Sequence, residues 1–184
     1  MGTGCRAGGV ALALLPIVSA SGAAARTQDA ERGRVLEAAA EIMASVRYCA
    51  LVTVDAEGAP QTRAMDPFPP EADLTVWLGT NASTRKVDQI RHDPRVTLFY
   101  FDPDGPAYVT LVGEARLVDD PVEKARRFKP EWDAFYDAGP RGGDYVLIRV
   151  DPLRVEVVSA PHGIAVDPKG WKPAIVSGLG AGED

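Results

Sequence analysis

The chain has 184 residues, of which 46% are hydrophobic and 25% are charged, the composition of one soluble globular domain. With 20 Lys and Arg against 26 Asp and Glu, its formal net charge is -6, so no general cationic field is available for nucleic acid or an anionic membrane. We expect neither as a partner of the mature chain, and any anionic ligand must be held by a local site. The two cysteines, Cys5 and Cys49, exclude a disulfide framework and offer no metal-binding pattern, and Cys49 is expected to be buried in a strand.

The first 25 residues are typical of a signal peptide. Arg6 gives a positively charged start, an apolar run covers residues 10–18, and small residues follow. The run is too short for a transmembrane helix, which needs about 20 apolar residues. Cleavage after Ala20 or Ala25 would place the protein in the periplasm or outside the cell. The alternative is a mis-set start codon, in which case the protein is cytoplasmic.

The remaining sequence alternates between helical and strand-like hydrophobic patterns. Helices are predicted over residues 29–46, 84–92 and 121–128, and strands over residues 48–54, 61–66, 74–80, 95–101, 107–117 and 145–158. Gly113 in the fifth strand indicates a β-bulge or a close neighbour. Six strands joined mostly by short turns predict a mainly β fold, a small antiparallel barrel with inserted helices.

The composition also predicts three parts of the chain. Residues 1–25 form the expected signal peptide, and residues 28–159 form the globular domain. Residues 160–184 contain scattered Gly, Pro and single apolar residues without periodicity, which predicts an irregular C-terminal tail.

The most informative chemistry lies where the strand at 74–80 leads into the helix at 84–92. This helix starts with Thr84, Arg85 and Lys86. Free amides and the positive end of the helix dipole attract an anion, and a hydroxyl with two cations would complete a phosphate site. Basic residues in a first turn oppose the dipole unless an anion compensates them. The alternative is a basic helix start that simply faces water.

Three segments occur in order between residues 63 and 120: Arg-Ala-Met at 63–65, TNASTRKVDQI at 80–90 followed by DPRVTL, and YVTLVGEARLVDD at 108–120. They resemble the pyridoxamine 5'-phosphate oxidase-like, FMN-binding split-barrel flavoproteins, with the general-stress branch nearest. The resemblance extends from about Ala39 to Ser159. It implies a six-stranded antiparallel split β-barrel and a homodimer that binds FMN at the subunit boundary.

The resemblance also implies individual cofactor contacts. Arg63 and Met65 would flank the flavin ring and its ribityl chain, and Tyr108 stands where oxidases of the family place a glutamine near the ring. The phosphate would be held by Thr80, Thr84, Arg85 and Lys86. Phe68 replaces the substrate-phosphate lysine of the vitamin oxidases, and their Arg-Leu-His type ending is missing. We therefore do not expect a true pyridoxamine phosphate oxidase.

These observations predict an FMN-dependent oxidoreductase that transfers hydride between FMN and a small organic substrate. The sequence contains no Ser-His-Asp motif, paired-carboxylate motif or glycine-rich dinucleotide motif, so no catalytic residue is assigned. One alternative is a flavin-binding stress or sensory protein without turnover. Another is a haem or deazaflavin binder on the same fold, for which His162 is a candidate ligand, whereas His92 is expected to stabilise the end of a helix.

Overall fold

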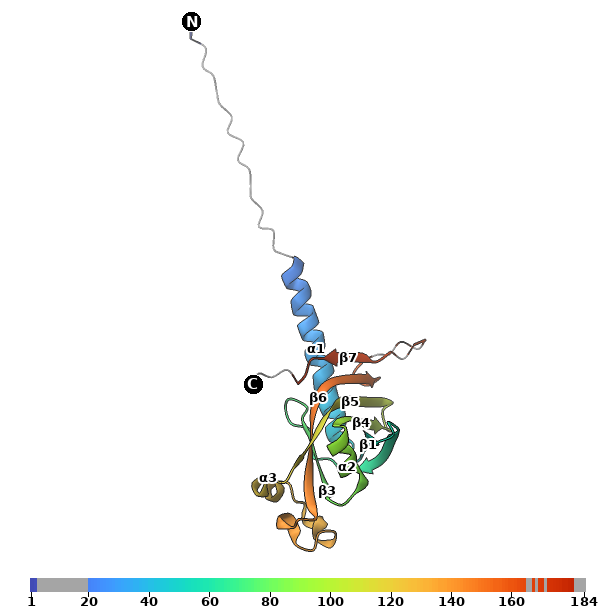
Figure 1. The fold of residues 1–184 in the computed structure, drawn as a ribbon. Helices are drawn as coiled ribbons and strands as arrows, with labels where there is room; N and C mark the ends of the chain where they lie inside the picture. Colours follow the sequence, from blue (N-terminus) through green and yellow to red (C-terminus); the bar gives the residue numbers. More distant parts are fainter. Residues whose placement is uncertain (3–19, 165–166, 168, 171, 181–184) are drawn as a thin grey trace.

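The computed structural model describes residues 1–2, 20–164, 167, 169–170 and 172–180 (Figure 1). Its helices are α1 (Ala20–Ser45), α2 (Arg85–His92) and α3 (Pro121–Arg126), followed by two 3-10 turns, η1 (Pro130–Ala134) and η2 (Gly139–Arg141). Its strands are β1 (Cys49–Val54), β2 (Pro60–Met65), β3 (Val76–Asn81), β4 (Arg95–Asp102), β5 (Ala107–Val118), β6 (Tyr145–Ser159) and β7 (Ala174–Ser177).

The strands form one antiparallel sheet in the order β2-β1-β4-β5-β6-β3, with β7 also paired to β6. A single bridge between Pro67 and Leu78 joins the chain just after β2 to β3. The two ends of the strand order therefore meet, as in a barrel that is open along one seam. This confirms the predicted mainly β split barrel with inserted helices, with seven strands in place of six.

The seventh strand, β7, lies in the segment for which the sequence predicted no regular structure. It pairs with the second half of β6, where Val176 lies opposite Val155. Val176 is buried, whereas its neighbour Ile175 is 57% exposed. Four residues are too few for alternation to be recognised in a sequence, and the pairing depends on β6 being in place. Residues 160–184 are therefore not irregular throughout.

The interior of the barrel is filled by side chains that alternate along the strands. Fully buried examples from three adjacent strands are Leu51, Leu98 and Leu111. The second half of α1 covers this core with Val35, Ala38, Ala39, Ile42 and Met43. Residues 22–32 of the same helix are exposed, and Figure 1 shows this half projecting away from the barrel.

Helix α1 begins at Ala20, earlier than the predicted start at Asp29. The added segment is rich in alanine, which has the highest intrinsic helix propensity. The apolar run at residues 10–18 lies outside the described residues, so the signal peptide and the export of the protein stay predictions. In the described part of the chain, no helix combines the length and apolar character needed to cross a bilayer.

The predicted irregularity at Gly113 is present. Val112 pairs with Arg154 and Gly113 with Pro152, so the register between β5 and β6 shifts by one residue at this point. A Cβ atom on Gly113 would lie 2.3 Å from the backbone oxygen of Asp151. Glycine is therefore required here by the close approach of the two strands.

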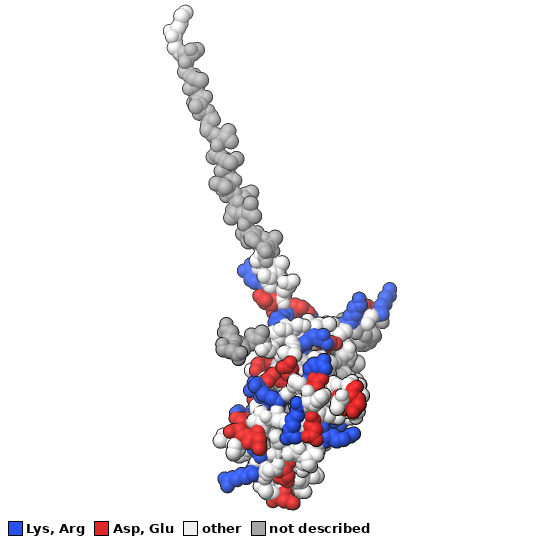
Figure 2. Space-filling view, in the orientation of Figure 1, with Lys and Arg blue, Asp and Glu red and all other residues white. Residues whose placement is uncertain are grey.

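A second apolar cluster lies outside the barrel, where α3 and the 3-10 turns cover β3 and the start of β6. It contains Trp77, Trp132, Tyr136, Tyr145 and Leu147. Figure 1 places this covering layer at the end of the barrel opposite β7. On the face shown in Figure 2, acidic and basic side chains are interspersed rather than separated by sign.

Candidate functional site

The turn between β3 and α2 is organised by Asn81. Its side-chain oxygen accepts hydrogen bonds from the backbone N–H of Ser83 at 2.9 Å and from the Ser83 hydroxyl at 2.7 Å. The hydroxyl of Thr84 donates to the backbone oxygen of Asn81 at 2.7 Å and does not cap the helix. Helix α2 therefore starts without a side-chain cap, and its first N–H groups are available to an anion.

Lys86 lies at the centre of this group. Its Nζ donates to Oγ1 of Thr80 at 2.9 Å and to Oγ1 of Thr84 at 3.0 Å, so one ammonium group joins the end of β3 to the start of α2. Burial lowers the pKa of the Lys86 ammonium, and the positive charge of Arg63 lowers it further. The site therefore holds a cation that is unfavourable in the absence of negative charge.

A cavity of about 380 Å³ is lined by Arg63, Ser83, Thr84, Arg85 and Lys86. Burial lowers the pKa of Arg63, and the charge of Arg85 acts in the same direction. Among the described residues, no carboxylate lies within ion-pair distance of any of these three cations. A chain with a net charge of -6 thus concentrates unneutralised positive charge at one helix start, which suits a phosphate group.

Arg63 is held toward this cavity by two residues that the sequence analysis missed, Thr53 and Gln89. Arg63 Nη1 donates to Thr53 Oγ1 at 2.7 Å, and Arg63 Nη2 donates to Gln89 Oε1 at 2.9 Å. Thr53 also donates to Gln89, at 2.6 Å. The available signal was a polar residue, Thr53, on the same side of its strand as the buried Leu51.

Arg63 lies opposite Leu51 in the β1–β2 pair, so its side chain starts from the inward face of β2 and not from the outward one. Met65, two residues on, shares that face and is buried in the core. Arg63 and Met65 therefore share one face of β2, although Met65 does not line the cavity.

Tyr108 is separate from the cavity within this chain. It lies on the outward face of β5, with its ring 5.6 Å from that of Phe99. The structure therefore brings together Arg63, Thr80, Thr84, Arg85 and Lys86 and leaves Met65 and Tyr108 apart. The flavin contacts of all seven residues stay predictions.

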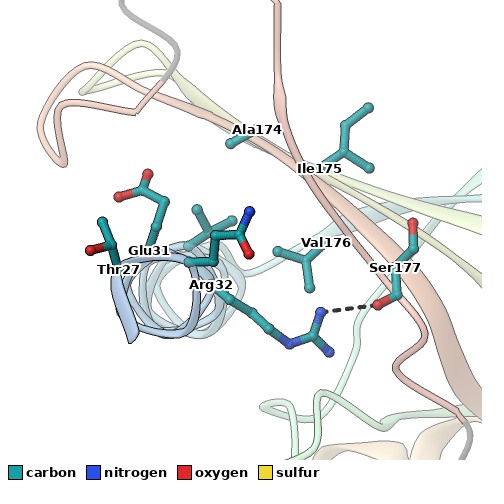
Figure 3. Close-up of a pocket in the computed structure, with 9 residues that line it drawn as sticks. Thr27, Glu31, Arg32, Ala174, Ile175, Val176 and Ser177 are labelled. Carbon is teal, nitrogen blue, oxygen red and sulfur yellow. Dashed lines mark hydrogen bonds between the residues drawn. The ribbon is translucent and has the colours of Figure 1, made fainter. Parts of the chain in front are cut away.

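A different cavity, of about 420 Å³, lies between α1 and β7 (Figure 3). Arg32 bounds it and donates to the backbone oxygen of Ser177 at 3.0 Å. None of the predicted site residues lines it. This cavity therefore contributes nothing to the candidate phosphate site.

The two histidines take different positions. His92 is the last residue of α2, where the sequence places it. His162 has both ring nitrogens in contact with side chains: Nδ1 lies 2.7 Å from Ser159 Oγ, and Nε2 lies 2.9 Å from Glu41 Oε2. These contacts join the end of β6 to α1 and disfavour His162 as a haem ligand.

Comparison with known proteins gives the family. The model of the family described as "Pyridoxamine 5'-phosphate oxidase" matches residues 35–159, most of the chain and all of the candidate site. The chain belongs to this family. No curated protein sequence matches it significantly.

Solved structures show the same fold at low sequence identity. A Clostridium acetobutylicum protein related to general stress protein 26 has a TM-score of 0.65 and 20% identity, covering 78% of this chain and 94% of its own. A Nostoc punctiforme protein described as pyridoxamine 5'-phosphate oxidase-related and FMN binding has a TM-score of 0.53 and 16% identity. The match covers 83% of this chain and 95% of the Nostoc chain. A haem-binding protein from Mycobacterium smegmatis has a TM-score of 0.54 and 20% identity. The match covers 80% of this chain and 57% of the Mycobacterium chain.

Proposed function

We propose that this protein binds FMN, with its phosphate at the start of α2, and exchanges hydride between the flavin and a small organic substrate. Family membership indicates a flavin or a haem on this fold. The observation that carries the choice of FMN is the contact of Lys86 Nζ with both Thr80 and Thr84, beside two further cations without carboxylate partners in the described chain.

The donors at this site fit a dianionic phosphate ester. The hydroxyls of Thr80 and Thr84, the charged groups of Arg85 and Lys86 and the first amides of α2 would hold the phosphate. Arg63, fixed by Thr53 and Gln89, would approach the rest of the cofactor from β2. Bound FMN supplies a ring that accepts and releases hydride, while the chain supplies binding, orientation and local charge.

We also propose a homodimer. The outward face around Tyr108 exposes Phe99 at 38% and Phe101 at 54%, an aromatic surface of the kind that a second copy would cover. Tyr108 is separate from the cavity of its own chain, so a role near the flavin requires the site of a second copy. Light scattering of the purified protein measures the subunit number, and a monomer at micromolar concentration would contradict the proposal.

The phosphate assignment is tested with the R85A/K86A variant. Both side chains lie outside the apolar core, so the fold should be retained while FMN is lost. Arg91→Ala is the matched control, because Arg91 lies on the same helix and pairs with Asp88 away from the cavity. The measurements are the visible spectrum, the flavin content per chain and far-UV circular dichroism. Equal flavin content in wild type and R85A/K86A would refute the site.

Turnover is tested separately from binding. Bleaching of bound flavin by NADPH, followed by reoxidation with an added acceptor, would support the oxidoreductase. Stable flavin binding without either reaction would support a stress or sensory protein instead. A Soret band in place of a flavin spectrum would identify a haem binder and overturn the choice of FMN.

A further inference from the structure

A second group of cations lies on the outside of the barrel, between α3 and the strands β3, β5 and β6. It surrounds a cavity of about 450 Å³, within the usual range of small-molecule sites. The four arginines that line it are Arg116, Arg126, Arg127 and Arg149. None of them belongs to the site at α2, which has a different set of lining residues.

The sheet itself places two of these arginines side by side. Arg149 of β6 lies opposite Arg116 of β5 on one side and opposite Trp77 of β3 on the other. Like charges directly opposite each other destabilise a sheet. One carboxylate, Asp151, serves both arginines, at 2.7 Å from Arg116 and 2.8 Å from Arg149.

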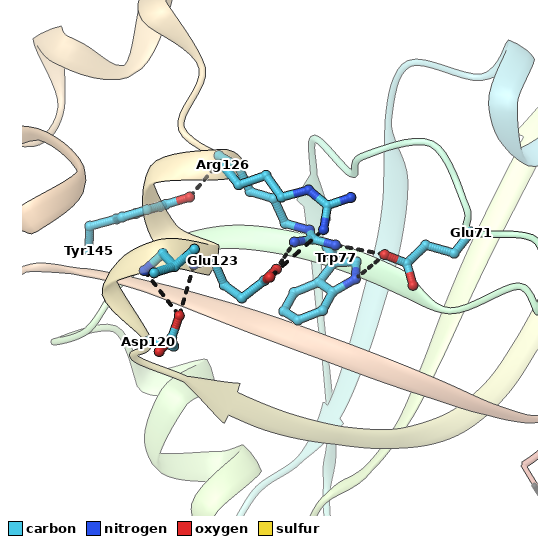
Figure 4. A network of polar contacts seen from close by, with 8 residues as sticks. Glu71, Trp77, Asp120, Glu123, Arg126 and Tyr145 are labelled. Atoms are coloured by element: carbon cyan, nitrogen blue, oxygen red, sulfur yellow. Dashed lines mark hydrogen bonds and ion pairs between the residues drawn. The ribbon is translucent and has the colours of Figure 1, made fainter.

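Arg127 forms one wall of the cavity. Its guanidinium lies 3.8 Å from the centre of the Trp77 ring, and its side chain is only 8% exposed. It pairs with Glu71 at 2.6 Å and with Glu123. Glu71 also accepts a hydrogen bond from Trp77 Nε1 at 2.9 Å, so the 67–73 loop, β3 and α3 are joined here (Figure 4). This wall is therefore held in one position by several contacts.

The carboxylates do not balance the arginines. Glu71 and Glu123 both form ion pairs with Arg127. Arg126 is paired with the same Glu123, at a longer distance of 3.8 Å. Asp151 is divided between Arg116 and Arg149. Four guanidinium groups thus meet three carboxylates, in a chain whose net charge is negative.

We propose that this cavity binds the oxyanion group of a small organic acid or phosphate monoester, with Arg126 and Arg149 as the main donors. A planar guanidinium matches the geometry of carboxylate and phosphate oxygens. An anion would also relieve the repulsion between Arg149 and Arg116. The proposal does not depend on flavin binding, because the two cavities share no residue.

The test is calorimetric titration with two probes, succinate for the carboxylate and glycerol 3-phosphate for the phosphate ester. We expect at least one probe to bind the wild type and to bind R85A/K86A equally well. Loss of a charged hydrogen bond should raise its Kd about tenfold or more in Arg126→Gln and in Arg149→Gln. Arg154→Gln is the matched control on β6, because Arg154 pairs with Glu156 and does not line the cavity.

Binding of only one probe identifies the class of oxyanion. Failure of both probes to bind would overturn the proposal, as would binding that is lost in R85A/K86A and kept in Arg149→Gln. Thermal unfolding without probe shows whether Arg149→Gln stays folded, because the substitution removes the like-charge pair with Arg116 together with the ion pair to Asp151. Arg126→Gln carries the test if Arg149→Gln is destabilised, since the Arg126 side chain is 68% exposed. Unchanged probe affinity in the folded variants would also overturn the proposal.

Discussion

The amide oxygen of Gln89 lies 2.9 Å from Nη2 of Arg63 and accepts its hydrogen bond, while the hydroxyl of Thr53 donates to the same oxygen. Gln89 is on α2 and Arg63 is on β2, so this contact fixes the helix that carries Arg85 and Lys86 relative to the hairpin. The proposed FMN site therefore depends on a side chain that need not touch the cofactor.

Replacing Gln89 with leucine should weaken both FMN binding and the fold. The half-buried Arg63 and the buried Thr53 would each lose an acceptor, which costs about 1–3 kcal/mol of unfolding free energy for each unsatisfied group. Chemical denaturation and FMN titration measure the two effects. If Gln89→Leu keeps the unfolding free energy and the FMN affinity of the wild type, Gln89 does not fix α2 relative to Arg63.

Gln89→Glu separates charge from hydrogen bonding. A glutamate keeps the acceptors for Arg63 and Thr53, so we expect nearly wild-type stability. It also adds a negative charge beside the proposed phosphate site, so FMN affinity should still fall about tenfold at low ionic strength. Unchanged FMN affinity in Gln89→Glu would indicate that the phosphate is held elsewhere.

The pH dependence of FMN binding should reflect Lys86. Burial and Arg63 lower the pKa of its ammonium group in the free protein, whereas a bound dianion favours the charged form. As the pH rises through the lowered pKa of Lys86, the free protein loses this charge. The affinity for FMN should therefore start to decrease at a lower pH than the one at which an ordinary lysine titrates. We expect a loss of about tenfold, measured by fluorescence titration between pH 8 and 10.

Lys86→Arg is the control for this pH effect, because a guanidinium stays charged over the same range. Its FMN affinity should change less between pH 8 and 10 than that of the wild type. An identical decline in both proteins would assign the titration to a different group.

Gly113→Ala should destabilise the barrel. The added Cβ would lie 2.3 Å from the Asp151 oxygen, and this atom belongs to the backbone of the bulged β6 and cannot rotate away. Overpacking of this kind costs about 1–3 kcal/mol. Gly143→Ala is the matched control, since a Cβ added at Gly143 would meet no atom within 4 Å. Equal melting temperatures for the two variants would refute the close approach of the strands.

Cys49 should be unreactive in the folded protein. It is buried at the start of β1, and burial raises the pKa of its thiol to about 12. At pH 8 almost no thiolate is present, and the thiolate is the reactive form. In a Cys5→Ser background, a thiol reagent should label Cys49 in denaturant and not in buffer. Rapid labelling in buffer would contradict its burial.

Much of the fold follows from local patterns in the sequence. Alternating residues from Tyr48 to Val54 and from Ala107 to Leu117 predict strands at nearly the observed bounds, since a strand with one buried face must alternate. The chemistry at the start of α2 is equally local, because Thr84, Arg85 and Lys86 are consecutive and Thr80 is one short turn away. Spacing along the chain was therefore enough to predict that these four residues lie together, whereas their binding of a phosphate stays a proposal.

Contacts between distant segments could be decided only by the tertiary structure. Strand β7 forms because β6 offers it an edge, and Gln89 reaches Arg63 because α2 packs beside the β1–β2 hairpin. The pairing of Arg116 with Arg149 likewise depends on the register of β5 against β6 after the bulge at Gly113. Such contacts join residues far apart in sequence, so no local period encodes them, and the free energy of packing selects them.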